Sequence, residues 1–147
     1  MKEKILVSAC LLGRLCRYDG RQVPCKEVIL LKDRYDFVEV CPEVMGGLPT
    51  PRIPSERVND KVINKAGIDV SVNYKKGAEI ALELCKKHGI KIALLKEKSP
   101  SCGSRGIYDG SFGGVLIPGE GVTAELLRKN GIKVYGESEV DKLLQLT

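Results

Sequence analysis

Residues 91–103 read KIALLKEKSPSCG. The apolar run that ends at Leu95 is typical of a buried strand, and the serine, proline and glycine residues after it are typical of a turn. Cys102 therefore lies on a turn just beyond the carboxyl end of an expected strand. A strand followed by a cysteine occurs at two other places in the chain, and this repeated arrangement predicts both the fold and a site.

Short apolar segments alternate with helical patterns along the chain. Besides residues 91–95, the segments that favour strands are 4–9, 35–40 and 131–135. The helical patterns are 25–31, 73–88 and 122–129. Strands alternating with helices predict an α/β fold, as a Rossmann-like three-layer domain with a mainly parallel sheet of four or more strands. Residues 46–68 carry three prolines and no clear period, so we expect a long functional loop there.

Composition favours one globular domain that spans residues 1–147. The chain is 43% hydrophobic and 29% charged, and it has no linker rich in proline, serine or glycine. The apolar run near the N-terminus is too short for a signal peptide or a membrane span, which predicts a cytoplasmic protein. The net charge of +5 is spread along the chain, so it indicates a mild preference for anionic partners and no nucleic-acid footprint.

The chain has six cysteines, and in a reducing compartment metal binding or catalysis is a more common use than disulfides. Cys10, Cys41 and Cys102 each follow an expected strand at its carboxyl end. Open α/β sheets bind ligands beyond those ends, so the three thiols are expected to converge on one site. Soft sulfur ligands suit zinc or an iron-sulfur cluster.

The alternative for each cysteine is a small buried hydrophobic side chain. We expect that role for Cys85, which lies on the apolar face of a helical pattern, and the roles of Cys16 and Cys25 stay open. The absence of any Cys-x-x-Cys pair counts against a zinc ribbon or a thioredoxin-like dithiol. His88 falls at a helix end, where a cation interacts favourably with the helix dipole.

Polar groups near these cysteines are candidates for proton transfer and substrate binding. Glu43, two residues after Cys41, is either a general base or a solvated loop carboxylate. Ser99 and Ser101 either face the site or only form the turn around Pro100. Two Tyr-Asp-Gly triplets and an arginine-containing loop add the candidate substrate-binding residues, which are Arg17, Tyr18, Asp19, Arg52, Tyr108 and Asp109.

Taken together, several motifs resemble those of the thiouracil desulfurase-like family of bacterial iron-sulfur desulfidases. The motifs are Val7-Ser8-Ala9-Cys10-Leu11-Leu12-Gly13, Arg17-Tyr18-Asp19-Gly20, Cys41-Pro42-Glu43, Gly46-Gly47-Leu48, Pro51-Arg52 and Lys98-Ser99-Pro100-Ser101-Cys102-Gly103. The resemblance covers nearly the whole chain. It implies a 4Fe-4S cluster held by Cys10, Cys41 and Cys102, and non-redox removal of sulfur from thiolated pyrimidines such as 2- or 4-thiouracil.

The resemblance also implies how the reaction runs. The iron that carries no protein ligand would bind the substrate sulfur as a Lewis acid, and Glu43 would activate water to attack the ring carbon. The sulfur would leave as hydrosulfide. A serine of the turn formed by Ser99 and Ser101 would orient or protonate the substrate.

Two other functions remain open at this point. Sulfur transfer to or from tRNA bases usually needs ATP to activate an oxygen, and the chain has no Gly-x-x-x-x-Gly-Lys-Ser/Thr loop. A cluster-based or thiol-based redox sensor would need a partner surface or a DNA-binding element. The expected partner is a small thiolated nucleobase, with no membrane and no indicated nucleic acid, and the oligomeric state stays open.

Overall fold

The computed structural model describes residues 2–13 and 25–145 of the chain. Its centre is a four-stranded, all-parallel sheet with the strand order β2-β1-β5-β8. The strands are β1 (Glu3–Ser8), β2 (Tyr35–Val40), β5 (Ile92–Leu95) and β8 (Lys133–Gly136). These are the four strands that the sequence predicts, with ends that differ by at most two residues.

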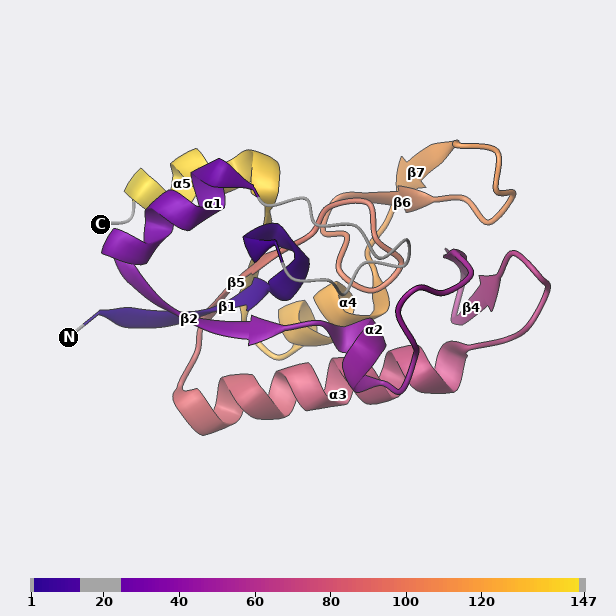
Figure 1. The fold of residues 1–147 in the computed structure, drawn as a ribbon, viewed down its shortest axis with the longest axis horizontal. Coiled ribbons are helices and arrows are strands. Elements are labelled where there is room, and N and C mark those ends of the chain that lie inside the picture. Colours follow the sequence, from indigo (N-terminus) through magenta and orange to yellow (C-terminus); the bar gives the residue numbers. More distant parts are fainter. Residues whose placement is uncertain (1, 14–24, 146–147) are drawn as a thin grey trace.

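Helices cover both faces of this sheet (Figure 1). One face packs on α3 (Ser71–His88) and α4 (Val122–Lys129), and the other packs on α1 (Lys26–Leu30) and α5 (Val140–Gln145). Successive side chains of a strand point to opposite faces, so Leu6 and Ala93 enter the first core while Ile5 and Leu94 enter the second. The predicted three-layer α/β fold is confirmed.

Short elements link these layers. They are α2 (Pro42–Met45) and three 3-10 helices, Ala9–Leu12, Leu31–Asp33 and Glu137–Glu139. The 3-10 helix Ala9–Leu12 begins directly after β1 and contains Cys10. α2 follows β2, and Cys41 lies between the two elements. α2 also lies against α3, because a Cβ atom built at Gly77 would come within 1.8 Å of the Pro42 carbonyl oxygen. Only glycine allows this close approach, which fixes the start of α2.

The prediction of a structureless loop over residues 46–68 is wrong in part. Its second half forms an antiparallel hairpin of β3 (Ser55–Val58) and β4 (Lys61–Asn64). Each strand has four residues and the turn uses Asn59 with φ 54°, a conformation that asparagine tolerates. Strands this short, with mixed polarity, give no clear period in the sequence.

A second hairpin was also not predicted. It joins β6 (Gly106–Tyr108) and β7 (Leu116–Pro118) in an antiparallel pair. Both hairpins lie beyond the carboxyl ends of the sheet strands, opposite the end where the chain begins (Figure 1). In the described part of the chain, none of the helices is both long enough and apolar enough to cross a membrane.

Candidate functional site

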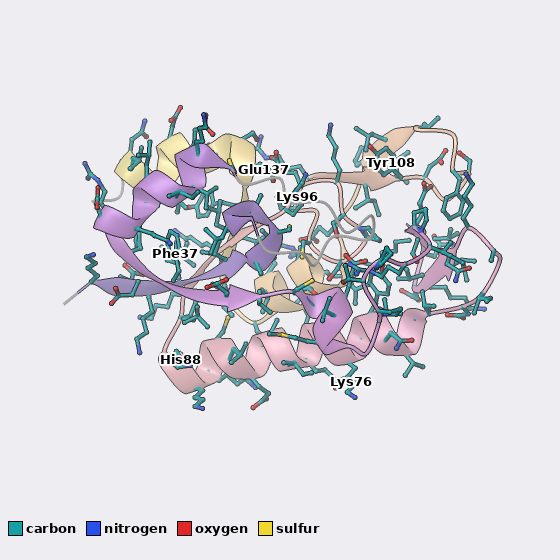
Figure 2. The ribbon with its side chains drawn as sticks, viewed as in Figure 1. Phe37, Lys76, His88, Lys96, Tyr108 and Glu137 are labelled. Carbon is teal, nitrogen blue, oxygen red and sulfur yellow. The ribbon has the colours of Figure 1, made fainter. Side chains whose placement is uncertain are left out.

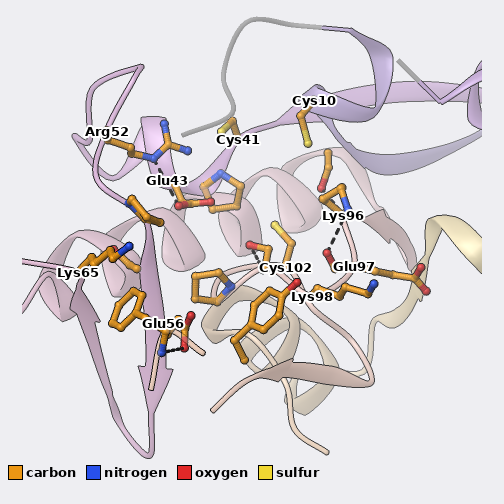
Figure 3. A pocket seen from close by; sticks show the side chains of 18 of the residues that line it. Cys10, Cys41, Glu43, Arg52, Glu56, Lys65, Lys96, Glu97, Lys98 and Cys102 are labelled. Atoms are coloured by element: carbon orange, nitrogen blue, oxygen red, sulfur yellow. Dashed lines mark hydrogen bonds and ion pairs between the residues drawn. The ribbon is translucent and has the colours of Figure 1, made fainter. Parts of the chain in front are cut away.

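A cavity of about 450 Å³ lies between the carboxyl ends of the sheet strands and the two hairpins. Cys10, Cys41 and Cys102 all line it, as the strand positions predict (Figure 3). Its volume falls within the range of about 300 to 1,000 Å³ that is typical of small-molecule sites. The parallel sheet therefore brings together three cysteines that are far apart in the sequence.

Each cysteine is positioned by a different local structure. Cys10 lies in the 3-10 helix after β1, which ends at Gly13 with φ 88°. Cys41 occupies the N-cap position of α2. Cys102 lies on the turn after β5, and this turn is held to the start of α4 by Val122 N–H, which donates to Pro100 O at 2.9 Å. All three backbones are thus fixed to elements of the sheet or of its helical layers.

The chemistry of this donor set fits a cluster better than a single ion. Among residues 2–13 and 25–145, no three His, Cys, Asp or Glu side chains are arranged to hold one metal ion. Three thiols around a shared cavity suit a polynuclear iron-sulfur group, whose size keeps its thiolate ligands apart. The sulfur spacing of about 6 to 7 Å that cubane ligation requires stays a prediction.

The thiol of Cys102 is the most deeply buried of the three. Burial, followed by the charge of the Glu43 carboxylate, raises the pKa of Cys102 to about 12, although hydrogen bonds from Ser8 and Ser101 oppose the rise. The group is therefore a neutral thiol until a metal binds. Because only the thiolate ligates metal, metal binding at this position must release a proton.

Glu43 is held in place and is not a freely solvated side chain. Its Oε1 atom accepts a short hydrogen bond from the Tyr74 hydroxyl and pairs with Arg52 Nε at 3.4 Å. Arg52 is itself fixed by Pro49 O at 3.0 Å and Thr50 Oγ1 at 3.2 Å. Burial and the nearby Glu43 charge raise the pKa of Tyr74 well above its usual range, so this phenol remains a donor. Glu43 lines the cavity from a fixed position (Figure 3).

The two serines of the cysteine turn have different environments. Ser99 lines the cavity, and its Oγ accepts the backbone N–H groups of Ser101 and Cys102, each at 3.1 Å. Ser101 is fully buried, lies outside the cavity lining, and its hydroxyl bonds to Thr123 Oγ1 at 2.8 Å. Because Ser99 already accepts two bonds, its own O–H is the part that remains for a cavity ligand.

The candidate substrate-binding residues separate into three groups. Arg52 and Tyr108 line the cavity. Asp109 is not among the lining residues, and its Oδ1 accepts bonds from the backbone and hydroxyl of Ser111 within the β6–β7 connection. The remaining candidates lie outside the described residues, and they are Arg17, Tyr18 and Asp19. Cys16 lies outside the described residues as well.

The cavity also contains polar residues that the sequence did not single out. Ser8 is the last residue of β1, and Lys96 is the first residue after β5. The Lys96 ammonium group pairs with the carboxylate of Glu137, the first residue of the last described 3-10 helix, at 2.8 Å (Figure 2). Ser8 and Lys96 both stand at carboxyl ends of strands, so the rule that located the cysteines also applies to them. Glu56 and Phe112, from the two hairpins, line the opposite wall and have no such signal.

Two further cysteines of the described residues, Cys25 and Cys85, lie away from the cavity lining. Cys85 is buried in the core between α3, α4 and the sheet, which confirms its predicted structural role. Cys25 precedes α1, and its Sγ donates to Glu27 at 3.4 Å. Neither residue lines the cavity.

Comparison with known proteins identifies the family. The sequence model of the 2-thiouracil desulfurase family matches residues 5–139. The chain belongs to this family. An uncharacterised Bacillus subtilis protein, YbbK, is 40% identical over 150 aligned positions that cover 95% of this chain and 99% of YbbK.

A similar solved structure extends the comparison to the fold. The 4Fe-4S-dependent thiouracil desulfidase TudS is 48% identical and superposes with a TM-score of 0.89. The alignment covers 99% of this chain and all of TudS. The similarity therefore includes both hairpins and the cysteine-bearing turns as well as the sheet.

Proposed function

We propose that this protein is a 4Fe-4S-dependent desulfidase that removes sulfur from thiouracil-type bases by a non-redox reaction in the cytoplasm. The observation that carries the proposal is the placement of Cys10, Cys41 and Cys102 around one cavity that also contains the anchored carboxylate of Glu43. Membership of the 2-thiouracil desulfurase family and the 48% identity to TudS support the same function.

The three cysteines are the residues that would hold the cluster. When bound, a cluster with three protein thiolates supplies a Lewis-acidic iron that polarises the carbon-sulfur bond of the substrate. The neutral cavity thiol of Cys102 gives up its proton when it becomes a ligand. The cysteine side of the cavity thus fixes where the substrate sulfur lies.

Glu43 takes the proton of the attacking water while the water oxygen forms a bond with the thiocarbonyl carbon. Tyr74 and Arg52 keep its carboxylate aimed at one position, which reduces the reorganisation that the reaction requires. Ser99 holds the substrate through a hydrogen bond from its hydroxyl group. As the carbon-sulfur bond breaks, the proton on Glu43 passes to the sulfur, which leaves as hydrosulfide, and the added hydroxyl group gives up its proton to become the carbonyl of uracil. The overall change is thiouracil plus water to uracil plus hydrogen sulfide, with no electron transferred.

Arg52 and Tyr108 are the candidate substrate-binding residues that lie on the described walls of the cavity. We include Arg17, Tyr18 and Asp19 in the same role from their sequence motif. The geometry favours Ser99 over Ser101 for contact with the base, because Ser101 is fully buried beside Thr123.

The test is anaerobic reconstitution of the protein with iron and sulfide, followed by incubation with 2-thiouracil or 4-thiouracil. We expect a brown cluster absorbance and release of uracil and sulfide in equal amounts. A protein that carries the cluster but releases no uracil from either base would contradict the proposal. Thiolated tRNA, tested in parallel, separates the free base from a polymeric substrate.

A further inference from the structure

The wall opposite the cysteines is organised around Glu56, a residue on β3. Glu56 is only 9% exposed. Its Oε1 atom accepts the backbone N–H groups of Gly110 at 2.8 Å and Phe112 at 3.2 Å. One carboxylate oxygen therefore joins the β3–β4 hairpin to the connection between β6 and β7.

The second carboxylate oxygen of Glu56, Oε2, does not join the two hairpins. Among the described residues, no hydrogen bond or ion pair is made to Oε2. If Oε2 were fully buried, it would be a buried oxygen without a partner. In the described part of the chain, Ser104 Oγ is the only side-chain nitrogen or oxygen of that kind, so Oε2 of Glu56 is accessible from open space. Glu56 lines the cavity, and Figure 3 shows one of its oxygens on a hydrogen bond and the other turned toward the cavity.

A carboxylate oxygen that faces a cavity in this way is an acceptor for a hydrogen-bond donor of a ligand. An ionised carboxylate can only accept hydrogen bonds, and leaving it without a partner in a low-dielectric site is unfavourable. Sulfide and phosphate anions would be repelled by its charge. A pyrimidine base, by contrast, presents ring N–H groups that a carboxylate accepts well.

The same contact also fixes the backbone that carries an aromatic side chain. Phe112 has φ 59°, an uncommon backbone conformation for a bulky residue, and its N–H bonds to Glu56. Phe112 and Tyr108 both line the cavity. Aromatic side chains provide flat apolar surfaces on which a base can stack.

We propose that Glu56 determines specificity by accepting, through Oε2, the ring N–H that lies across the pyrimidine ring from the thiocarbonyl carbon of the substrate. This inference rests on the proposed function, since it takes the cavity ligand to be a thiolated pyrimidine. It restricts the substrate class to bases that keep this N–H. In 4-thiouracil the group is N1–H, so a methyl group at N1 should exclude the base.

Glu56→Gln is a specific test because the substitution replaces only the carboxylate oxygen that faces the cavity. The two backbone N–H groups hold the amide oxygen in the Oε1 position, which places the NH₂ group where Oε2 was. The hairpins stay joined, but an acceptor facing the cavity becomes a donor. Glu79→Gln, an exposed change on α3, is the matched control.

Two measurements on the cluster-loaded protein separate recognition from turnover. The first is calorimetric binding of uracil and N1-methyluracil. The second is kcat/KM for 4-thiouracil and N1-methyl-4-thiouracil. We expect the parent and Glu79→Gln to prefer the unmethylated compound on the order of 10- to 100-fold, the range for a hydrogen bond to a buried charge, and Glu56→Gln to lose most of this preference.

Each outcome bears on one of the two proposals. If the parent releases sulfide from 4-thiouracil but Glu56→Gln keeps the parental preference, the role of Glu56 is overturned while the proposed function stands. If the parent itself binds N1-methyluracil as tightly as uracil, the proposed role of Glu56 is overturned without any variant. If the parent binds uracil selectively through Glu56 but releases no sulfide, base recognition is supported and the proposed reaction is wrong.

Discussion

The two walls of the cavity are built in different ways. The cysteine wall, formed by Cys10, Cys41 and Cys102, stands on strands and helices whose apolar side chains fill two cores. The hairpin wall, formed by β3–β4 and β6–β7, has little core of its own, and every residue of β7 is exposed. Polar contacts made by Glu56 and Arg57 hold it in place.

This difference suggests a division of roles. Under the proposals above, the groups that would carry out the chemistry lie on the wall that packs on the cores, and Glu56, which would select the ligand, lies on a short element joined by a few hydrogen bonds. The consequence is testable, because substitutions on the cysteine wall should abolish function while those on the hairpin wall should tune it.

The largest effect is expected on the cysteine wall. Replacing Cys10, Cys41 or Cys102 by alanine should abolish the cluster absorbance after anaerobic reconstitution, because each loses a thiolate ligand. Cys85→Ala is the matched control, since this thiol is buried in the core, and it should keep the absorbance. Equal loss in all four variants would indicate a folding defect and would remove the evidence for ligation.

The cysteine wall is also the part that the sequence predicts well. Strand periodicity located all four sheet strands, and the rule that parallel strands end together placed three distant cysteines in one cavity. Glu43 followed from its position beside Cys41. Its partner Tyr74 was not predicted, because the two residues meet only when α2 packs on α3.

The hairpin wall could not be predicted in the same way. Its strands have three or four residues, too few for a period, and its position depends on tertiary bonds between segments far apart in the sequence. Asp109 illustrates the limit of prediction from sequence motifs on this wall. Its Tyr-Asp-Gly motif suggested a substrate contact, whereas its carboxylate bonds to Ser111 in the turn.

A second prediction separates chemistry from ligation within the cysteine wall. Glu43→Gln should keep the cluster absorbance but lower the single-turnover rate of desulfuration by roughly 100- to 10,000-fold, the usual range for loss of a general base. The amide keeps the shape of the side chain and cannot take a proton from water. A rate within a factor of about three of the parent, measured under argon, would show that another group is the base.

A third prediction concerns the joint between the two hairpins. Glu56→Ala removes the acceptor for the Gly110 and Phe112 N–H groups, so these amides should exchange with deuterium about 10 to 100 times faster. Amides of β1 and β5 should keep their protection, because their bonds lie within the sheet. Exchange that speeds up equally in the sheet would mean that the two walls open together, against the comparison drawn above.

The smallest effect is expected where the hairpin wall meets the helical layer. Arg57 lies on β3, and its guanidinium group pairs with the Glu125 carboxylate of α4 at 3.0 Å. The hydrogen bond from Arg57 lowers the pKa of Glu125. A carboxyl whose pKa is lower in the folded state contributes stability above its unfolded pKa of about 4.3 and loses it as the pH falls through the folded value. Glu125→Gln should therefore unfold in urea with about 0.5 to 1 kcal/mol less stability than the parent at pH 7, a modest value because the carboxylate is partly exposed. The difference should shrink toward zero below pH of about 4, measured on the cluster-free chain, since acid decomposes iron-sulfur clusters. A difference that stays constant across this range would show that the amide disturbs packing, and that the ion pair does not hold the hairpin to α4.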